Sequence, residues 1–133
     1  MELAREATIK AQSPMTRLAD AGLAPWRLRR VIAYFEAHLG EPMSLAEMAS
    51  AVGLSRMHFA AKFRESMGLR PHEYILRRRI GRAREMIARN EASLVEIALS
   101  VGFQSQSHFT CVFKRFTGLP PHAWRETRKQ VAQ

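Results

Sequence analysis

The side chains best suited to chemistry in this chain of 133 residues are hydrogen-bonding and basic groups in two segments, 55–67 and 105–117. At about 100° per residue, Ser107, Cys111 and Lys114 share one face of a helix. Gln pairs with adenine through two hydrogen bonds and Arg pairs with guanine in the same way, while Ser accepts several bases. Amides at a helix N-terminus suit phosphate. We therefore expect both segments to be helices that contact DNA.

Two sets of candidate contacts follow from these side-chain types and positions. The candidates for contacts with base edges are Arg56, Met57, Ala61, Gln104, Gln106, Ser107 and Cys111. The candidates for contacts with phosphates are Ser55, Arg64, Arg78, Arg82, Ser105, Lys114 and Arg115. The second segment offers more groups that hydrogen-bond to bases, whereas Met57 and Ala61 in the first suit the methyl group of thymine.

Phenylalanine stripes predict which face of each segment is buried. Phe59, Phe63 and Met67 follow at helical spacing in the first segment, as do Phe109, Phe113 and Phe116 in the second. Gly68 and Gly118 then end the two helices. A stripe of this kind is typical of a helix packed on a core, which leaves the opposite face for DNA.

The two segments belong to an internal repeat. Ser44 to Glu47 and Ser93 to Glu96 both have the spacing of a capping box, and Gly53 and Gly102 follow them. The offset between the copies is 49 here and 50 from His58 and His108 onward, so one residue is inserted, which we place at the start of the second recognition helix. Each copy predicts a short helix, a tight turn and a second helix that fits the major groove.

The remaining segments predict further helices. Pro25 begins one with an apolar stripe at Leu28, Ile32, Phe35 and Leu39, ending at Gly40. The segment after Pro71 predicts a long basic helix buried through Leu76, Ile80, Ala83 and Ile87. Its arginines are expected to offer charge to phosphates: Arg77, Arg78, Arg79, Arg82, Arg84 and Arg89. No segment shows sustained strand alternation, so we expect an all-α fold.

Four parts follow from these boundaries. We expect an N-terminal arm or linker over 1–24, a first helix-turn-helix subdomain over 25–71, a linking helix over 72–90 and a second subdomain over 91–129.

Composition supports a polyanionic partner. The 21 Lys and Arg residues outnumber 12 Asp and Glu residues, giving a net charge of +9, which favours nucleic acid first and a membrane surface second. No run approaches the roughly 20 apolar residues that span a bilayer, and no secretory leader is evident, so we expect no membrane association and a cytoplasmic location. Cys111 is the single cysteine, and no metal-ligand cluster, cofactor-binding motif or catalytic constellation stands out. We therefore expect no metal, no cofactor and no enzyme activity.

The stretch from Ile97 to Arg125, IALSVGFQSQSHFTCVFKRFTGLPPHAWR, resembles the AraC/XylS family of bacterial transcription regulators, and the resemblance extends over residues 25–128. It implies a seven-helix domain of two helix-turn-helix subdomains joined by a linking helix. It further implies binding to promoter DNA and activation of transcription through RNA polymerase. Most members carry a separate effector-binding or dimerisation domain. This chain has no room for one and identifies no effector, so we expect a short stand-alone member or an excised DNA-binding domain.

One departure from the family and one alternative function remain. Members often carry an Arg in the middle of each recognition helix, where this chain has Ala61 and Cys111. We therefore expect Arg56, Gln104 and Gln106 to carry more of the specificity. The alternative is a protein-interaction module, an antagonist of a regulator, that holds an acidic partner through its basic helices.

Overall fold

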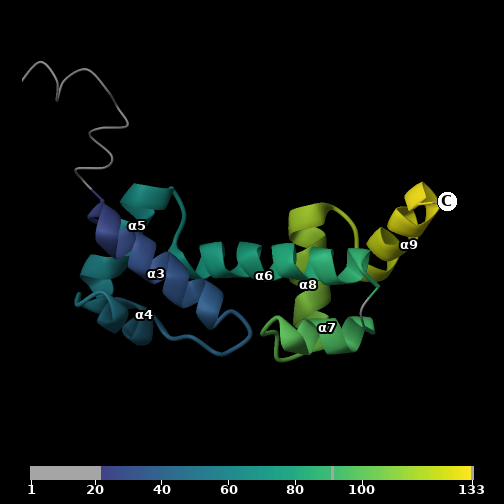
Figure 1. Ribbon diagram of the computed structural model, residues 1–133, viewed down its shortest axis with the longest axis horizontal. Coiled ribbons are helices and arrows are strands. Elements are labelled where there is room, and N and C mark those ends of the chain that lie inside the picture. The colour runs from purple at the N-terminus through teal and green to yellow at the C-terminus, as the bar shows by residue number, and fades with distance from the viewer. Residues whose placement is uncertain (1–21, 91, 133) are drawn as a thin grey trace, which may run out of the picture. The chain divides into compact units, whose positions relative to one another are not determined.

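The computed structural model describes residues 22–90 and 92–132, which form seven helices and no strand (Figure 1). The helices are α3 (Pro25–Ala37), α4 (Leu45–Ala51), α5 (Arg56–Met67), α6 (Pro71–Ala88), α7 (Leu94–Ser100), α8 (Gln106–Thr117) and α9 (Pro121–Ala132). The prediction of an all-α, seven-helix fold is confirmed. Residues 1–21 of the expected arm lie outside the described range.

The chain divides into two compact units. In the described range, the first holds residues 22–37 and 43–73 and therefore α3, α4 and α5. The second holds residues 38–42 and everything from 74 onward, so it contains most of α6 together with α7, α8 and α9. The short segment 38–42 thus belongs to the second unit although it follows α3 directly in the chain.

The first unit is built around phenylalanine rings contributed by α3 and α5. Phe35 and Phe63 meet edge to face with ring centroids 5.8 Å apart, and Phe59 lies 5.8 Å from Phe63. All three rings are fully buried, which confirms the predicted inward stripe of α5 for Phe59 and Phe63, while Met67 is only half-buried. Leu23 is buried as well, and its amide donates to the Ser66 hydroxyl at 2.7 Å. The last residues of the expected arm therefore pack on α5.

Helix α3 begins at Pro25 as predicted but differs from the prediction in its end and its buried face. It ends at Ala37, three residues before Gly40. Val31 is fully buried, whereas Ile32 is only half-buried. The observed face therefore runs through Val31 and Phe35, which are four residues apart and lie over one another on a helix.

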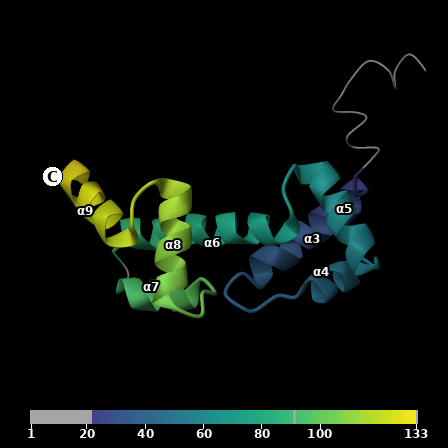
Figure 2. The ribbon, with the colours of Figure 1, turned by 180° about the vertical axis from the view of Figure 1, so that it is seen from behind.

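The second unit has one core to which α6, α7 and α8 all contribute (Figures 1 and 2). Leu76, Ile80, Ala83 and Ile87 of α6 are buried there, as the periodicity predicts. Phe109 and Phe113 of α8 are fully buried, and Trp124 of α9 meets Phe113 edge to face at 5.7 Å. The predicted stripe is thus confirmed for these two rings, while Phe116 is only partly buried.

Serine and glycine caps fix where the helices start and stop. Both predicted capping boxes are present: the Ser44 hydroxyl accepts from the Glu47 amide and the Ser93 hydroxyl accepts from the Glu96 amide, each at 3.1 Å. Gly68 ends α5 in the left-handed conformation at φ 77°. Such caps satisfy backbone groups that a helix end leaves unpaired.

The position of the inserted residue differs from the prediction. The amides of Leu54 and Phe103 donate to the carbonyls of Ala49 and Ala98, so the copies still match there with an offset of 49. The two second helices are capped by Ser55 and Ser105, an offset of 50. The extra residue is therefore Gln104, which lies in the turn before the cap and not in the helix itself.

Arg79 is a buried residue of the second unit and not a surface cation as predicted. Only 8% of it is exposed, and its guanidinium donates from Nε to the Leu39 carbonyl at 2.9 Å and from Nη2 to the Glu41 carbonyl at 2.8 Å. Burial lowers the pKa of Arg79. Its side chain is therefore committed to holding segment 38–42 and is removed from the set of candidate phosphate contacts.

Candidate nucleic-acid interface

The face of α5 opposite its buried phenylalanines is exposed to solvent. Met57, Ala61 and Arg64 follow at spacings of four and three residues, which place them on one face. Met57 is 84% exposed, so packing does not explain why an apolar side chain stands there. Arg56 is exposed at the start of the same helix.

The N-terminus of α5 is built as an anion-binding end. Ser55 is the N-cap, and its hydroxyl accepts from the amide of His58 at 3.3 Å. No acidic residue lies in the first turn of this helix. The positive end of the helix dipole is therefore not neutralised by a side chain of that turn, which suits a phosphate.

Helix α8 presents a matching face in the second unit. Ser107, Cys111 and Lys114 are exposed at the same spacings, and they occupy the repeat positions of Met57, Ala61 and Arg64. The Ser105 hydroxyl caps the helix by accepting from the His108 amide at 3.1 Å, again with no acidic residue in the first turn. The two helices therefore have the same length, cap and exposed register.

The two faces differ in their chemistry. Around the start of α8, Gln104, Gln106 and Ser107 are all exposed and all carry hydrogen-bonding groups. The corresponding part of α5 offers Arg56 and the apolar side chain of Met57. Hydrogen-bonding contact with base edges is thus concentrated on α8, whereas the start of α5 offers one cation, Arg56, and the apolar side chain of Met57.

Arg115 differs from the other candidates because its guanidinium is stacked on an aromatic ring. It lies 4.5 Å from the ring centroid of Phe116, and Arg77 of α6 lies over the same ring at 5.2 Å. Stacking holds a guanidinium plane in place while its N–H edge remains able to donate. Arg77 and Arg115 are therefore two cations held in place over the Phe116 ring of α8.

Arg78 and Arg82 are less exposed to solvent than the candidates on α5 and α8. Both are half-buried on α6 and both have interactions within the protein. A Cβ added to Gly81 would come within 3.3 Å of an Arg78 terminal nitrogen, so that side chain covers the glycine. These two arginines therefore differ from the candidates on α5 and α8, which are exposed.

Two basic clusters were missed by reasoning from the sequence. Arg84 and Arg128 lie over Trp124, with distances to the ring centroid of 5.6 and 5.3 Å. Arg27 and Arg30 lie over Trp26, at 4.8 and 5.5 Å. For Arg30 and Arg128 the usable signal was an Arg four residues along a helix from a Trp, because side chains at that spacing meet. Arg84 lies on another helix than Trp124, so no local spacing indicated its contact.

The described residues form neither a membrane span nor a metal site. No helix of the described range has both the length and the apolar character needed to cross a membrane. Within that range, no group of three or more His, Cys, Asp or Glu residues is placed to hold a metal ion.

Comparison with known proteins gives a family match over more than half of the chain. A family model described as a helix-turn-helix domain matches residues 48–127. The probable transcriptional regulator LumQ of Photobacterium leiognathi is 40% identical over 88 residues, which are 66% of this chain and 36% of that protein. GbdR of Pseudomonas aeruginosa, a helix-turn-helix transcriptional regulator, is 33% identical over 100 residues, 75% of this chain and 27% of its own length. The chain thus spans about a third of the length of these curated relatives.

Solved structures show the same fold. An AraC-type transcriptional regulator from Chromobacterium violaceum superimposes with a TM-score of 0.72 at 32% identity, covering 78% of this chain and 93% of its own. The DNA-binding domain of the global transcriptional factor AdpA, solved in complex with a target DNA, gives a TM-score of 0.75 at 27% identity. That comparison covers 78% of this chain and 94% of the AdpA domain.

Proposed function

Because the chain belongs to the AraC-type helix-turn-helix family of transcription regulators, we propose that it is a sequence-specific DNA-binding domain whose helices α5 and α8 enter successive major grooves of one duplex. The observation that carries the proposal is the repeated exposed face. Met57, Ala61 and Arg64 on α5 match Ser107, Cys111 and Lys114 on α8, opposite buried phenylalanines. The solved complex of the AdpA domain with its target DNA supports it.

The two helices then contribute unequally to specificity. Gln104, Gln106 and Ser107 hydrogen-bond to base edges, whereas Met57 and Ala61 contact thymine methyl groups. Arg56 is the one candidate on α5 that pairs with guanine through two hydrogen bonds. We therefore expect a longer and better defined half-site under α8 than under α5.

Phosphate contacts hold the domain in register on the duplex. Ser55 and Ser105 cap helix ends that suit phosphate, and Arg64, Lys114 and Arg115 add cations on the same exposed faces. Arg78 and Arg82 stay in this role as secondary contacts, since each is half-buried. The excess of basic residues, +9 in net charge, favours association with DNA at every sequence.

The wider role follows from the family. We propose that the regulator acts in the bacterial cytoplasm as an activator that contacts RNA polymerase at promoters. The alternative is a module that binds an acidic protein through its basic surface, and the stacked pairs Arg77–Arg115 and Arg84–Arg128 are the observation that favours it. The two functions differ in their dependence on duplex sequence.

Selection of bound sequences from a random duplex pool tests the proposal directly. We expect two unequal motifs whose centres lie about 10 base pairs apart. Gln106→Ala should relax the motif assigned to α8, and Arg56→Ala the motif assigned to α5, each without changing the other. Enrichment of no motif, together with stable binding to an acidic protein, would favour the alternative. Unchanged preferences in both variants would refute the assignment of these residues.

A further inference from the structure

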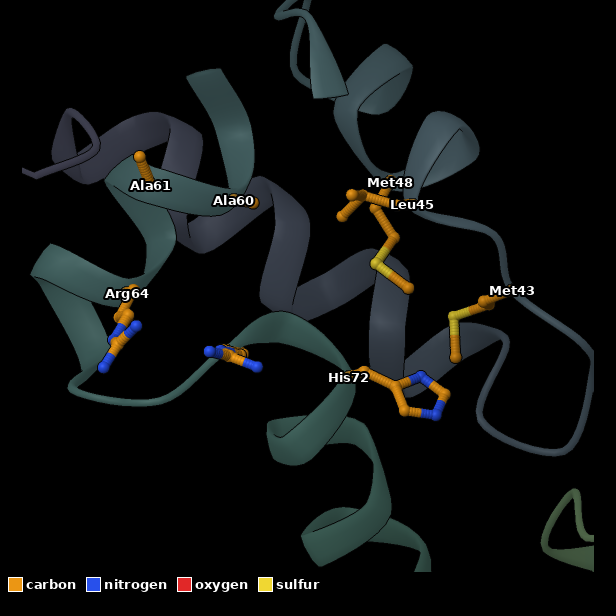
Figure 3. A pocket seen from close by; sticks show the side chains of 8 residues that line it. Met43, Leu45, Met48, Ala60, Ala61, Arg64 and His72 are labelled. Carbon is orange, nitrogen blue, oxygen red and sulfur yellow. The ribbon is translucent and has the colours of Figure 1, made fainter. Parts of the chain in front are cut away.

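A groove in the first unit has only two of its lining residues, Ala61 and Arg64, among the candidate contacts with DNA. Its volume is about 470 Å³, within the range of roughly 300–1,000 Å³ that is usual for small-molecule sites. The labelled side chains come from α4, α5, the segment before α4 and the start of α6 (Figure 3). The lining residues are Met43, Leu45, Met48, Ala60, Ala61, Arg64, Arg70 and His72.

The groove has an apolar wall that adapts to a ligand. Met43, Leu45 and Met48 supply it, and the small residues Ala60 and Ala61 line the groove as well. Methionine side chains are unbranched and polarisable, so they adjust to ligands of different outline. An alkyl chain buried against this wall gains the free energy of leaving water.

The polar groups of the groove are all basic. Arg64, Arg70 and His72 line it, and no Asp or Glu is among its lining residues. An Arg guanidinium binds a carboxylate through two parallel hydrogen bonds. We propose that this groove binds a small amphipathic monocarboxylate, with its alkyl chain against the methionines and its carboxylate on Arg64 and Arg70.

The second copy of the repeat does not have the same set of lining residues. Pro120 stands in place of Arg70, and Ala92 in place of Met43. The carbonyl of Ala92 accepts from Arg125 at 2.7 Å, and the Ala92 side chain packs against the core of the second unit. The combination of two methionines with two arginines is therefore found in the first copy and not in the second.

A ligand bound in the groove also affects DNA binding. This part of the inference rests on the proposed function. Ala61 and Arg64 line the groove and also belong to the exposed face of α5. A carboxylate held by Arg64 neutralises a cation proposed to contact phosphate. The ligand and DNA therefore compete for the same side chains.

Calorimetric titration of the whole chain with octanoate, in the absence of DNA, tests the site. Octanoate should bind at least about tenfold more tightly than octan-1-ol, because only the acid has a charge for the arginines. Arg70→Gln should weaken octanoate binding about tenfold, with retained helicity showing that it folds. The matched control, Arg84→Gln, removes one cation from the second unit and should leave octanoate binding unchanged.

A second measurement separates this proposal from the proposed function. Fluorescence anisotropy with a labelled duplex should show weaker DNA binding in the presence of octanoate, and a smaller effect in Arg70→Gln. No octanoate binding, equal affinity for acid and alcohol, or equal weakening by both substitutions would overturn the groove proposal. Octanoate binding that depends on Arg70 in a chain that binds no duplex would support the groove and overturn the DNA-binding proposal alone.

Discussion

Arg79 donates from Nε to the carbonyl oxygen of Leu39 at 2.9 Å, a hydrogen bond between residues 40 positions apart. The same guanidinium reaches the Glu41 carbonyl through Nη2 at 2.8 Å. Segment 38–42 has no regular hydrogen-bonding ladder of its own, so its carbonyls need partners once they are shielded from water. The buried Arg79 side chain donates to two of these carbonyls, which explains why a charged residue stands in this core.

Replacing Arg79 by Ala should strongly destabilise the second unit. The substitution leaves the Leu39 carbonyl without its donor in a buried place, and a second carbonyl loses its partner. We expect a loss of about 2–4 kcal/mol in the free energy of unfolding, measured by urea denaturation. Arg70→Ala, which removes an exposed arginine, should change it by less than about 0.5 kcal/mol. Similar losses in the two variants would contradict the structural role of Arg79.

Gly102 and Gly53 form a matched pair for a second test. Both have positive φ, 104° and 72°, and both follow the first helix of a helix-turn-helix. A Cβ on Gly102 would lie 2.7 Å from Arg79 Nε and 2.7 Å from the Leu39 carbonyl oxygen, while a Cβ on Gly53 meets nothing within 4 Å. The same mutation therefore tests backbone strain alone at one site and strain plus crowding at the other.

Gly53→Ala should cost about 1–2 kcal/mol, which is the cost of a left-handed conformation for an L-residue. Gly102→Ala should cost about 2–5 kcal/mol, since overpacking adds about 1–3 kcal/mol to that strain. Thermal unfolding of both variants gives the comparison. Equal losses of stability in the two variants would show that the residues around Gly102 shift to accommodate a methyl group.

Local rules predicted most of the helix boundaries, because caps and glycines act over only a few residues. Ser93 with Glu96, and Gly118 at φ 89°, are examples that the structure confirms. The role of Arg79 was missed because its partner lies 40 residues away. A signal was present, however: Arg79 stands four residues before Ala83 and three after Leu76, on the buried stripe of α6.

The exposure of the candidate faces of α5 and α8 could be predicted for the same reason that the helices could. Once Phe59, Phe63, Phe109 and Phe113 fix the buried side, helical geometry alone places the opposite side in solvent. Stacked cations such as Arg128 over Trp124 could not be predicted with equal ease, because many side-chain conformations compete on an exposed surface. The inserted residue was predicted at the start of the second helix, but Gln104 lies one position before its N-cap. Only the cap at Ser105 marks where α8 begins, and the sequence alone does not show that cap.

Acid should weaken the second unit through Glu96. Hydrogen bonds from the Ser93 hydroxyl and then from its backbone amide lower the pKa of Glu96. A carboxylate with a depressed pKa in the folded state stabilises the fold at neutral pH, and this contribution is lost as pH falls below the ordinary value of about 4.3. Between pH 7 and pH 3, the free energy of unfolding should fall less in Glu96→Gln than in the natural chain. An identical pH dependence would show that the capping box is not linked to protonation.

Salt dependence should distinguish phosphate contacts from base contacts. Lys114→Ala removes an exposed cation from α8, and we expect the slope of log affinity against log salt to fall in magnitude by about 0.9. The loss of affinity should be similar for every duplex sequence. Lys129→Ala, which removes a cation 3.8 Å from Glu126 on α9, serves as the control and should leave the slope unchanged. A loss confined to one sequence would assign Lys114 to a base.

Introducing an arginine at Cys111, where the family resemblance leads us to expect one, should change specificity at one position. Cys111 is exposed in the middle of the outward face of α8, so Cys111→Arg introduces a guanidinium where only a short side chain stands. We expect a new preference for guanine at the facing base pair, about 1–3 kcal/mol in discrimination, with the rest of the motif retained. Ala88→Arg adds the same charge at the exposed end of α6, outside the candidate interface, and should give no new preference for any base. Selection from a random duplex pool measures both variants. A Cys111→Arg motif identical to that of the natural chain would mean that this face of α8 does not reach the bases.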